Sequence, residues 1–131
     1  MTAAAATAAE PGRRLAGLTV LIVEDESIIS FLVEDMLKDI GCTTVLHASG
    51  VAAALALLAA QPPDAAVLDV NLAGEMVFPV AERLQAAGIP FIFTTGYGLK
   101  GMPPNWALLP VVQKPFKREA LTAALASAVG R

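Results

Sequence analysis

The sequence has little thiol chemistry and little charge. Its single cysteine, Cys42, cannot form an internal disulfide or a multi-thiolate metal site. Charged residues make up only 16% of the chain, against 56% hydrophobic residues, and this balance excludes a globally disordered protein. Nine basic residues face twelve acidic ones, so the net charge of -3 argues against electrostatic binding to nucleic acid or to an anionic membrane. We therefore expect a reduced, cytoplasmic protein that binds neither.

The sequence also lacks a long apolar run and a second block of distinct composition. Its longest apolar run, Val51–Ala60, falls short of the about 20 residues that a membrane-spanning helix needs. The alanine-rich start has its arginines after the apolar part, which is the reverse of a secretory signal. The 131 residues correspond to one domain. We expect a flexible alanine-rich tail over residues 1–16 and one domain over residues 17–131, with no output domain after it.

Apolar strands and amphipathic helices alternate along the rest of the chain. Residues 18–23 form a continuous apolar run, typical of a strand that is buried on both faces of a parallel sheet. In residues 27–40 the apolar side chains recur at helical spacing, and Ser49 is placed to cap the next helix. Further strands are expected over residues 43–46, 65–68, 90–95 and 111–114, and further helices over residues 51–60, 78–87 and 117–129. The pattern predicts an α/β fold, a doubly wound five-stranded parallel sheet with helices on both faces.

The segment between the fourth and fifth expected strands disfavours a regular helix. Gly101 and the pair Pro103-Pro104 interrupt it, so we expect this fourth helix to be short, distorted or mobile. Two aromatic residues of the segment, Tyr97 and Trp106, have two open interpretations. They anchor a partner, or they pack against the edge of the sheet.

Polar side chains follow the expected strands where each strand ends. Glu24 and Asp25 come after the first strand, Asp69 ends the third, Thr95 ends the fourth and Lys114 ends the fifth. In open parallel sheets the ligand site lies beyond the carboxyl ends of the strands, so these side chains are expected to converge.

The chemistry of these groups fits phosphoryl transfer. Carboxylates at close range repel one another unless a cation neutralises them, and oxygen ligands suit Mg²⁺. A lysine and a hydroxyl that face the same point can hold the oxygens of a phosphoryl group. An aspartate can act as the nucleophile and form an acyl phosphate. We interpret the set as a site for metal-assisted phosphoryl transfer onto Asp69.

Four short motifs in this order resemble the receiver domain of response regulators, the CheY-like family. They are VEDE with Glu24 and Asp25, LDVN with Asp69, TTG with Thr95, and QKPF with Lys114. The resemblance implies a flavodoxin/CheY-like (βα)5 fold with strand order 2-1-3-4-5. It also implies that Asp69 is the phosphoacceptor, Thr95 the switch hydroxyl and Lys114 the phosphoryl-binding lysine.

The same resemblance implies a metal and a partner. Mg²⁺ is expected on Asp25, Asp69 and the backbone carbonyl of Asn71, with Glu24 acting through water. The partner that donates the phosphoryl group is expected to be a sensor histidine kinase or a histidine phosphotransfer protein. The domain is then regulatory rather than an enzyme, with Mg²⁺-dependent self-phosphorylation and autodephosphorylation, and it is a monomer or a weak dimer that signals by protein contact.

The run FTTGYG at Phe93 resembles the FAT GUY subgroup of stand-alone receivers in part, since Thr94 replaces the alanine and Gly98 replaces the final tyrosine. Val111 stands where many receivers carry an aromatic residue that swings inward on activation. Because glycine and proline interrupt the segment after this run, we expect residues 96–109 to become more or less ordered when Asp69 is phosphorylated.

Two functions remain open for such a domain. The first is a phosphorylatable single-domain response regulator in a two-component phosphorelay. The second is an interaction module on the same fold that works without phosphorylation. The presence of every acidic and basic site residue favours the first.

Overall fold

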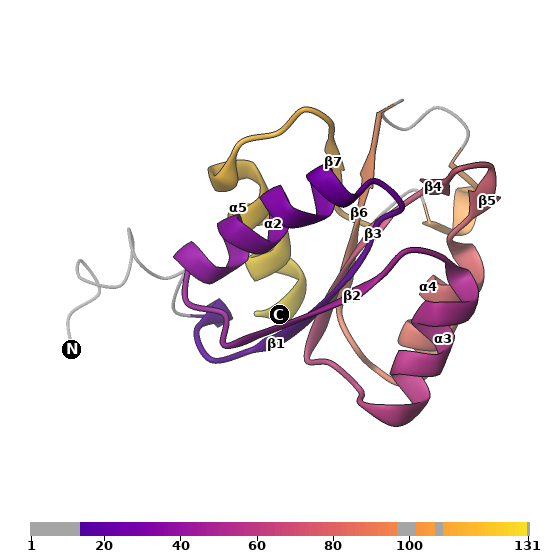
Figure 1. Cartoon of the computed structure of the whole chain (residues 1–131), viewed down its shortest axis with the longest axis horizontal. Coiled ribbons are helices and arrows are strands. Elements are labelled where there is room, and N and C mark those ends of the chain that lie inside the picture. Colours follow the sequence, from indigo (N-terminus) through magenta and orange to yellow (C-terminus); the bar gives the residue numbers. More distant parts are fainter. Residues whose placement is uncertain (1–13, 97–101, 107–108, 131) are drawn as a thin grey trace.

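The main sheet of the protein is five-stranded and parallel. The computed structural model describes residues 14–96, 102–106 and 109–130 (Figure 1). The strands are β1 (Thr19–Val23), β2 (Thr44–Ala48), β3 (Ala65–Asp69), β6 (Phe91–Thr95) and β7 (Val111–Gln113). They stand in the order β2-β1-β3-β6-β7, and every neighbouring pair is parallel. This is the expected order 2-1-3-4-5, so the prediction of a doubly wound sheet is confirmed.

Helices cover both faces of the sheet, as Figure 1 shows. One face carries α2 (Ser27–Asp39) and α5 (Arg118–Val129), and the other carries α3 (Val51–Ala60) and α4 (Phe78–Ala86). In the described part of the segment between β6 and β7, a short 3-10 turn at Pro104–Trp106 replaces a regular helix. Across the described ranges, no helix has both the length and the apolar character needed to cross a membrane.

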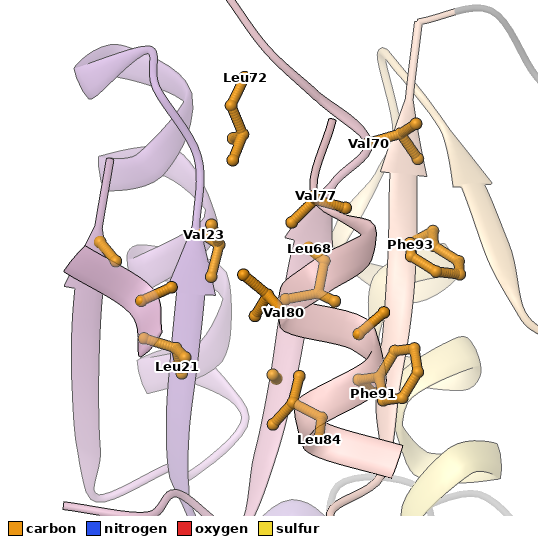
Figure 2. Close-up of a cluster of buried hydrophobic side chains, with 14 of the residues drawn as sticks. Leu21, Val23, Leu68, Val70, Leu72, Val77, Val80, Leu84, Phe91 and Phe93 are labelled. Atoms are coloured by element: carbon orange, nitrogen blue, oxygen red, sulfur yellow. The ribbon is translucent and has the colours of Figure 1, made fainter. Parts of the chain in front are cut away.

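Alternate residues of each strand supply the two cores. Leu21 and Val23 of β1 face the α3/α4 layer, whereas Val20 and Ile22 face the α2/α5 layer. Figure 2 shows the first core, in which side chains of β1, β3 and β6 meet those of α4. Because both faces of the sheet are covered, its central strands are apolar almost throughout, and polar groups are left to the strand ends.

Trp106 packs into the first core beside the aromatic side chains of β6 and α4. Its ring stacks on Phe78 with centroids 6.3 Å apart and lies edge-on to Phe91 and Phe93, each at 6.0 Å. With only 3% of its surface exposed, Trp106 packs against the sheet and is not available as a partner anchor. Residues 97–101, which include Tyr97, and residues 107–108 of the expected switch segment lie outside the described residues.

Two local expectations need correction, and the structure adds one element that the sequence does not predict. Leu15 lies within the tail that we expect over residues 1–16, yet its side chain is fully buried in the second core, so the packed domain includes residues before Gly17. Ser49 does not cap α3, because the N-cap residue is Gly50 and no side chain of the cap bonds the helix. A hairpin of β4 (Asn71–Leu72) and β5 (Glu75–Met76) was not expected at all. The expected flexibility of residues 1–13 falls outside the described residues.

Candidate functional site

The acidic end of β1 lies between the ends of β2 and β3. The backbone N–H of Glu24 donates to the carbonyl oxygen of Ala48 at 3.0 Å, which holds the end of β1 beside the end of β2. The Glu24 side chain is 3% exposed, and its Oε2 accepts a hydrogen bond from the backbone N–H of Glu26 at 3.1 Å. Asp25 is half-buried and faces the site. The two acidic residues therefore differ in burial: Glu24 lies below the surface, and Asp25 lies at the surface.

Asp69 meets this acidic pair because β3 is the neighbour of β1. The strands pair from Val20 with Ala65 up to Val23 with Leu68, so Asp69 ends β3 one position beyond. One carboxylate oxygen of each of Glu24, Asp25 and Asp69 lies within 4.8 Å of the others. The pairing of these parallel strands thus brings the Asp69 carboxyl group to the adjacent pair Glu24 and Asp25, from which it is far apart in the sequence.

Lys114 provides the positive charge of the site. Its Nζ donates to Glu24 Oε1 at 2.7 Å and lies 3.3 Å from Asp69 Oδ2. Its backbone N–H donates to the carbonyl oxygen of Thr95 at 2.8 Å, which aligns the ends of β7 and β6. The following Lys114–Pro115 peptide bond is cis. One ammonium group thus lies between two buried carboxyl groups.

Burial sets the proton affinity of Asp69. Loss of water around the carboxyl group and the nearby charge of Glu24 raise its pKa to about 7, although Lys114 acts in the opposite direction. Burial lowers the pKa of Lys114, but its hydrogen bond to Glu24 and the charges of Glu24 and Asp69 outweigh this, so the net shift is upward. The lysine therefore stays charged, while the metal-free site keeps a proton on Asp69 more readily than an exposed aspartate would.

An open hollow of about 440 Å³ lies over these groups. It is lined by residues from four strand ends and the hairpin, including Asp25, Asp69, Asn71, Thr95 and Lys114. The structure therefore places five of the six predicted site residues around one hollow. The sixth, Glu24, lies behind it and contacts Lys114.

The donor set of the hollow fits Mg²⁺. Carboxylate oxygens of Asp25 and Asp69 are the hard ligands that this ion prefers, and the open volume leaves room for the waters that it keeps. Because the site has three carboxyl groups and one lysine, it also carries an excess of negative charge that a divalent cation would neutralise. Both oxygens of Glu24 already accept hydrogen bonds, so Asp25 and Asp69 are the better placed direct ligands.

The residues that sequence reasoning missed lie in the β4–β5 hairpin. Ala73 and Gly74 line the hollow from the turn of this hairpin, where both have positive φ, 56° and 96°. The turn is closed by a 2.6 Å hydrogen bond from the Gly74 N–H to Asn71 Oδ1. Strands of two residues give no periodic pattern, and only the Asn and Gly at the turn offered a signal.

A parallel sheet of this order, with acids, a hydroxyl and a lysine at its carboxyl edge, has the architecture of a receiver domain. The chain matches the family of the response regulator receiver domain over residues 20–126, and it belongs to this family. Receiver domains are regulatory phosphoacceptor domains of two-component systems.

Individual relatives agree with this assignment. The chain is 34% identical over 112 residues to the sensory transduction protein LytT of Enterococcus faecalis, a match that covers 79% of this chain and 44% of LytT. The chain therefore spans less than half the length of this curated relative. The solution structure of SdrG from Sphingomonas melonis Fr1 is similar with a TM-score of 0.76 and 43% identity, over 84% of this chain and 94% of that chain.

A metal-bound relative is also similar. The receiver domain of the sensor histidine kinase PA1611 from Pseudomonas aeruginosa PAO1, which has a magnesium ion coordinated in its active-site cleft, gives a TM-score of 0.76. Its sequence is 26% identical, over 88% of this chain and 100% of that chain.

Proposed function

We propose that this protein is a single-domain response regulator whose Asp69 accepts a phosphoryl group from a phosphohistidine of a partner protein. The observation that carries the proposal is the position of Asp69, which lies within 4.8 Å of two other carboxyl groups and 3.3 Å from the Lys114 ammonium. Similarity to SdrG over 94% of that chain supports action as a single domain, and the TTGYG run supports the FAT GUY subgroup.

In the proposed reaction, a carboxylate oxygen of Asp69 attacks the phosphorus atom of the phosphohistidine. The new O–P bond forms as the P–N bond breaks, and the electron pair returns to the imidazole nitrogen of the donor. Mg²⁺, when held by Asp25, Asp69 and the Asn71 carbonyl, supplies positive charge for the phosphoryl oxygens. Lys114 lies next to Asp69 and can pair with one of these oxygens, and Thr95 lines the same hollow.

The surface beside the hollow suits a protein donor. Three large apolar side chains of the first half of α2 are exposed: Ile28 (75%), Phe31 (62%) and Leu32 (50%). A group of this kind on a helix next to the acidic site is typical of a surface that contacts a protein partner. It supports phosphotransfer from a sensor histidine kinase or a histidine phosphotransfer protein rather than from small molecules alone.

Phosphotransfer profiling tests the proposal. Histidine kinases labelled by autophosphorylation, and phosphotransfer proteins labelled by a kinase, are mixed with the protein in Mg²⁺, and transfer of label is followed over time. We expect rapid transfer from one or a few donors and none to Asp69→Asn. If no donor labels the wild type while the protein still binds a partner, the interaction module that works without phosphorylation is the correct function.

A further inference from the structure

The β4–β5 hairpin follows directly on the strand that carries Asp69. Its base is fixed by the Val77 N–H, which donates to the carbonyl oxygen of Val70 at 3.0 Å. Its inner face is fixed by the buried side chain of Leu72. Asn71, whose carbonyl is the expected metal ligand, is the first residue of this hairpin. The position of the hairpin therefore decides where the Asn71 carbonyl lies.

Glu75 connects the hairpin to α3. Its Oε1 accepts a hydrogen bond from the backbone N–H of Val51, the first residue of the helix, at 3.2 Å. The helix has no cap of its own, because the N-cap residue is Gly50 and the first turn contains no acidic residue. A carboxylate at a helix N-terminus accepts from an otherwise unpaired N–H and interacts favourably with the helix dipole. Glu75 thus caps α3 from a distant part of the chain.

This contact spans the acidic end of β1. In the sheet, β2 and β3 flank β1, so the segment after β2 and the hairpin after β3 lie on opposite sides of Glu24 and Asp25. The Glu75–Val51 hydrogen bond joins these two segments, and Figure 1 shows the hairpin close to the end of the α3/α4 layer. The hairpin is therefore held from its base, its inner face and, through Glu75, its outer side.

We propose that Glu75 is a positioning residue for the metal site, an inference that rests on the proposed Mg²⁺ site. Glu75 does not line the hollow, and it acts through the hairpin, which carries Asn71 into the lining of the hollow beside Asp25 and Asp69. Mg²⁺ demands near-ideal octahedral geometry, so its affinity is sensitive to a small displacement of one oxygen ligand. Groups that orient metal ligands indirectly affect affinity for this reason.

The test compares Mg²⁺ binding by three variants of the full chain. Glu75→Ala removes the acceptor, Glu75→Gln removes the charge but keeps an acceptor oxygen, and Glu82→Ala removes an exposed glutamate of α4 as a control. Mg²⁺ is titrated into isotope-labelled protein, and the affinity is read from amide chemical shifts. Exchange of the Val51 amide is measured in the metal-free proteins.

We expect Glu75→Ala to weaken Mg²⁺ binding about tenfold, at the lower end of the range for groups that orient metal ligands. Its Val51 amide should exchange faster, while Glu75→Gln retains most of both the affinity and the protection. An unchanged Mg²⁺ affinity in Glu75→Ala would overturn the role of Glu75 but not the metal site. Equal losses of Mg²⁺ affinity in Glu75→Ala and Glu75→Gln would also overturn this role, because they would indicate an effect of charge. Absence of Mg²⁺ binding by the wild type would overturn the metal site and the role of Glu75 together.

Discussion

Lys114 is closer to Glu24 than to Asp69, with its ammonium nitrogen 2.7 Å from Glu24 Oε1 and 3.3 Å from Asp69 Oδ2. The other oxygen of Glu24 accepts from the Glu26 N–H, so this buried carboxylate is fully engaged. Glu24 therefore holds the lysine beside Asp69 and at the same time adds negative charge next to it.

This relationship makes Glu24→Gln informative. Because the charge of Glu24 raises the pKa of Asp69, its removal should lower that pKa below the wild-type value of about 7. Titration of the Asp69 carboxyl carbon by NMR in metal-free protein measures the effect. Glu26→Gln, at an exposed neighbouring position, serves as the control and should leave the titration nearly unchanged. An unaltered Asp69 titration in Glu24→Gln would contradict the electrostatic coupling.

The raised pKa of Asp69 predicts a pH dependence of stability. In the unfolded chain the pKa is near the ordinary value of 3.8, and in the folded, metal-free protein it is about 7. The folded state binds the Asp69 proton more tightly than the unfolded state does, so protonation of Asp69 stabilises the fold. This stabilisation is fully present below pH 3.8 and is lost as the pH rises through about 7.

Urea unfolding in a chelator measures this effect when wild type is compared with Asp69→Asn. We expect the free energy of unfolding of the wild type to fall, relative to that of the variant, as the pH rises from the unfolded-state pKa of 3.8 to the folded-state pKa of about 7. A difference between the two proteins that stays constant over this range would show that Asp69 titrates at its ordinary value.

Leu15 tests the boundary of the packed domain. Its side chain is fully buried, so Leu15→Ala should lower the free energy of unfolding by about 2–5 kcal/mol through lost burial and a residual cavity. Leu32→Ala is the matched control, because 50% of the Leu32 side chain is exposed and the same atoms are removed. We expect the control to lose about 0.5 kcal/mol or less in chemical denaturation. Similar losses in both variants would contradict the burial of Leu15.

The sequence predicts the strands and the meeting of their polar ends because both follow from one rule, whereas the strand order and the role of each site residue are implied by the resemblance to receiver domains. Continuous apolar runs predict strands that are buried on both faces, and parallel packing then places their polar ends at one edge. Glu24, Asp69 and Lys114 could therefore be assigned to one site although they come from separate strands.

What the sequence could not predict depends on contacts between distant segments. Ser49 has the chemistry of a helix cap, but the first N–H of α3 is bonded by Glu75, which follows it by more than twenty positions in the chain. Leu15 lies next to an alanine-rich segment with no periodicity, and only the second core shows that it is buried. Trp106 had two interpretations until its contacts with Phe78 and Phe93 placed it in the first core.

The central claim is that Asp69 accepts a phosphoryl group with the help of Mg²⁺, and intact-protein mass measurement after incubation with acetyl phosphate tests it most directly. We predict that the wild type gains the mass of one phosphoryl group in Mg²⁺, gains none in a chelator, and that Asp69→Asn gains none in either. A wild type that gains no mass in Mg²⁺, or an Asp69→Asn variant that gains the same mass, would contradict the account.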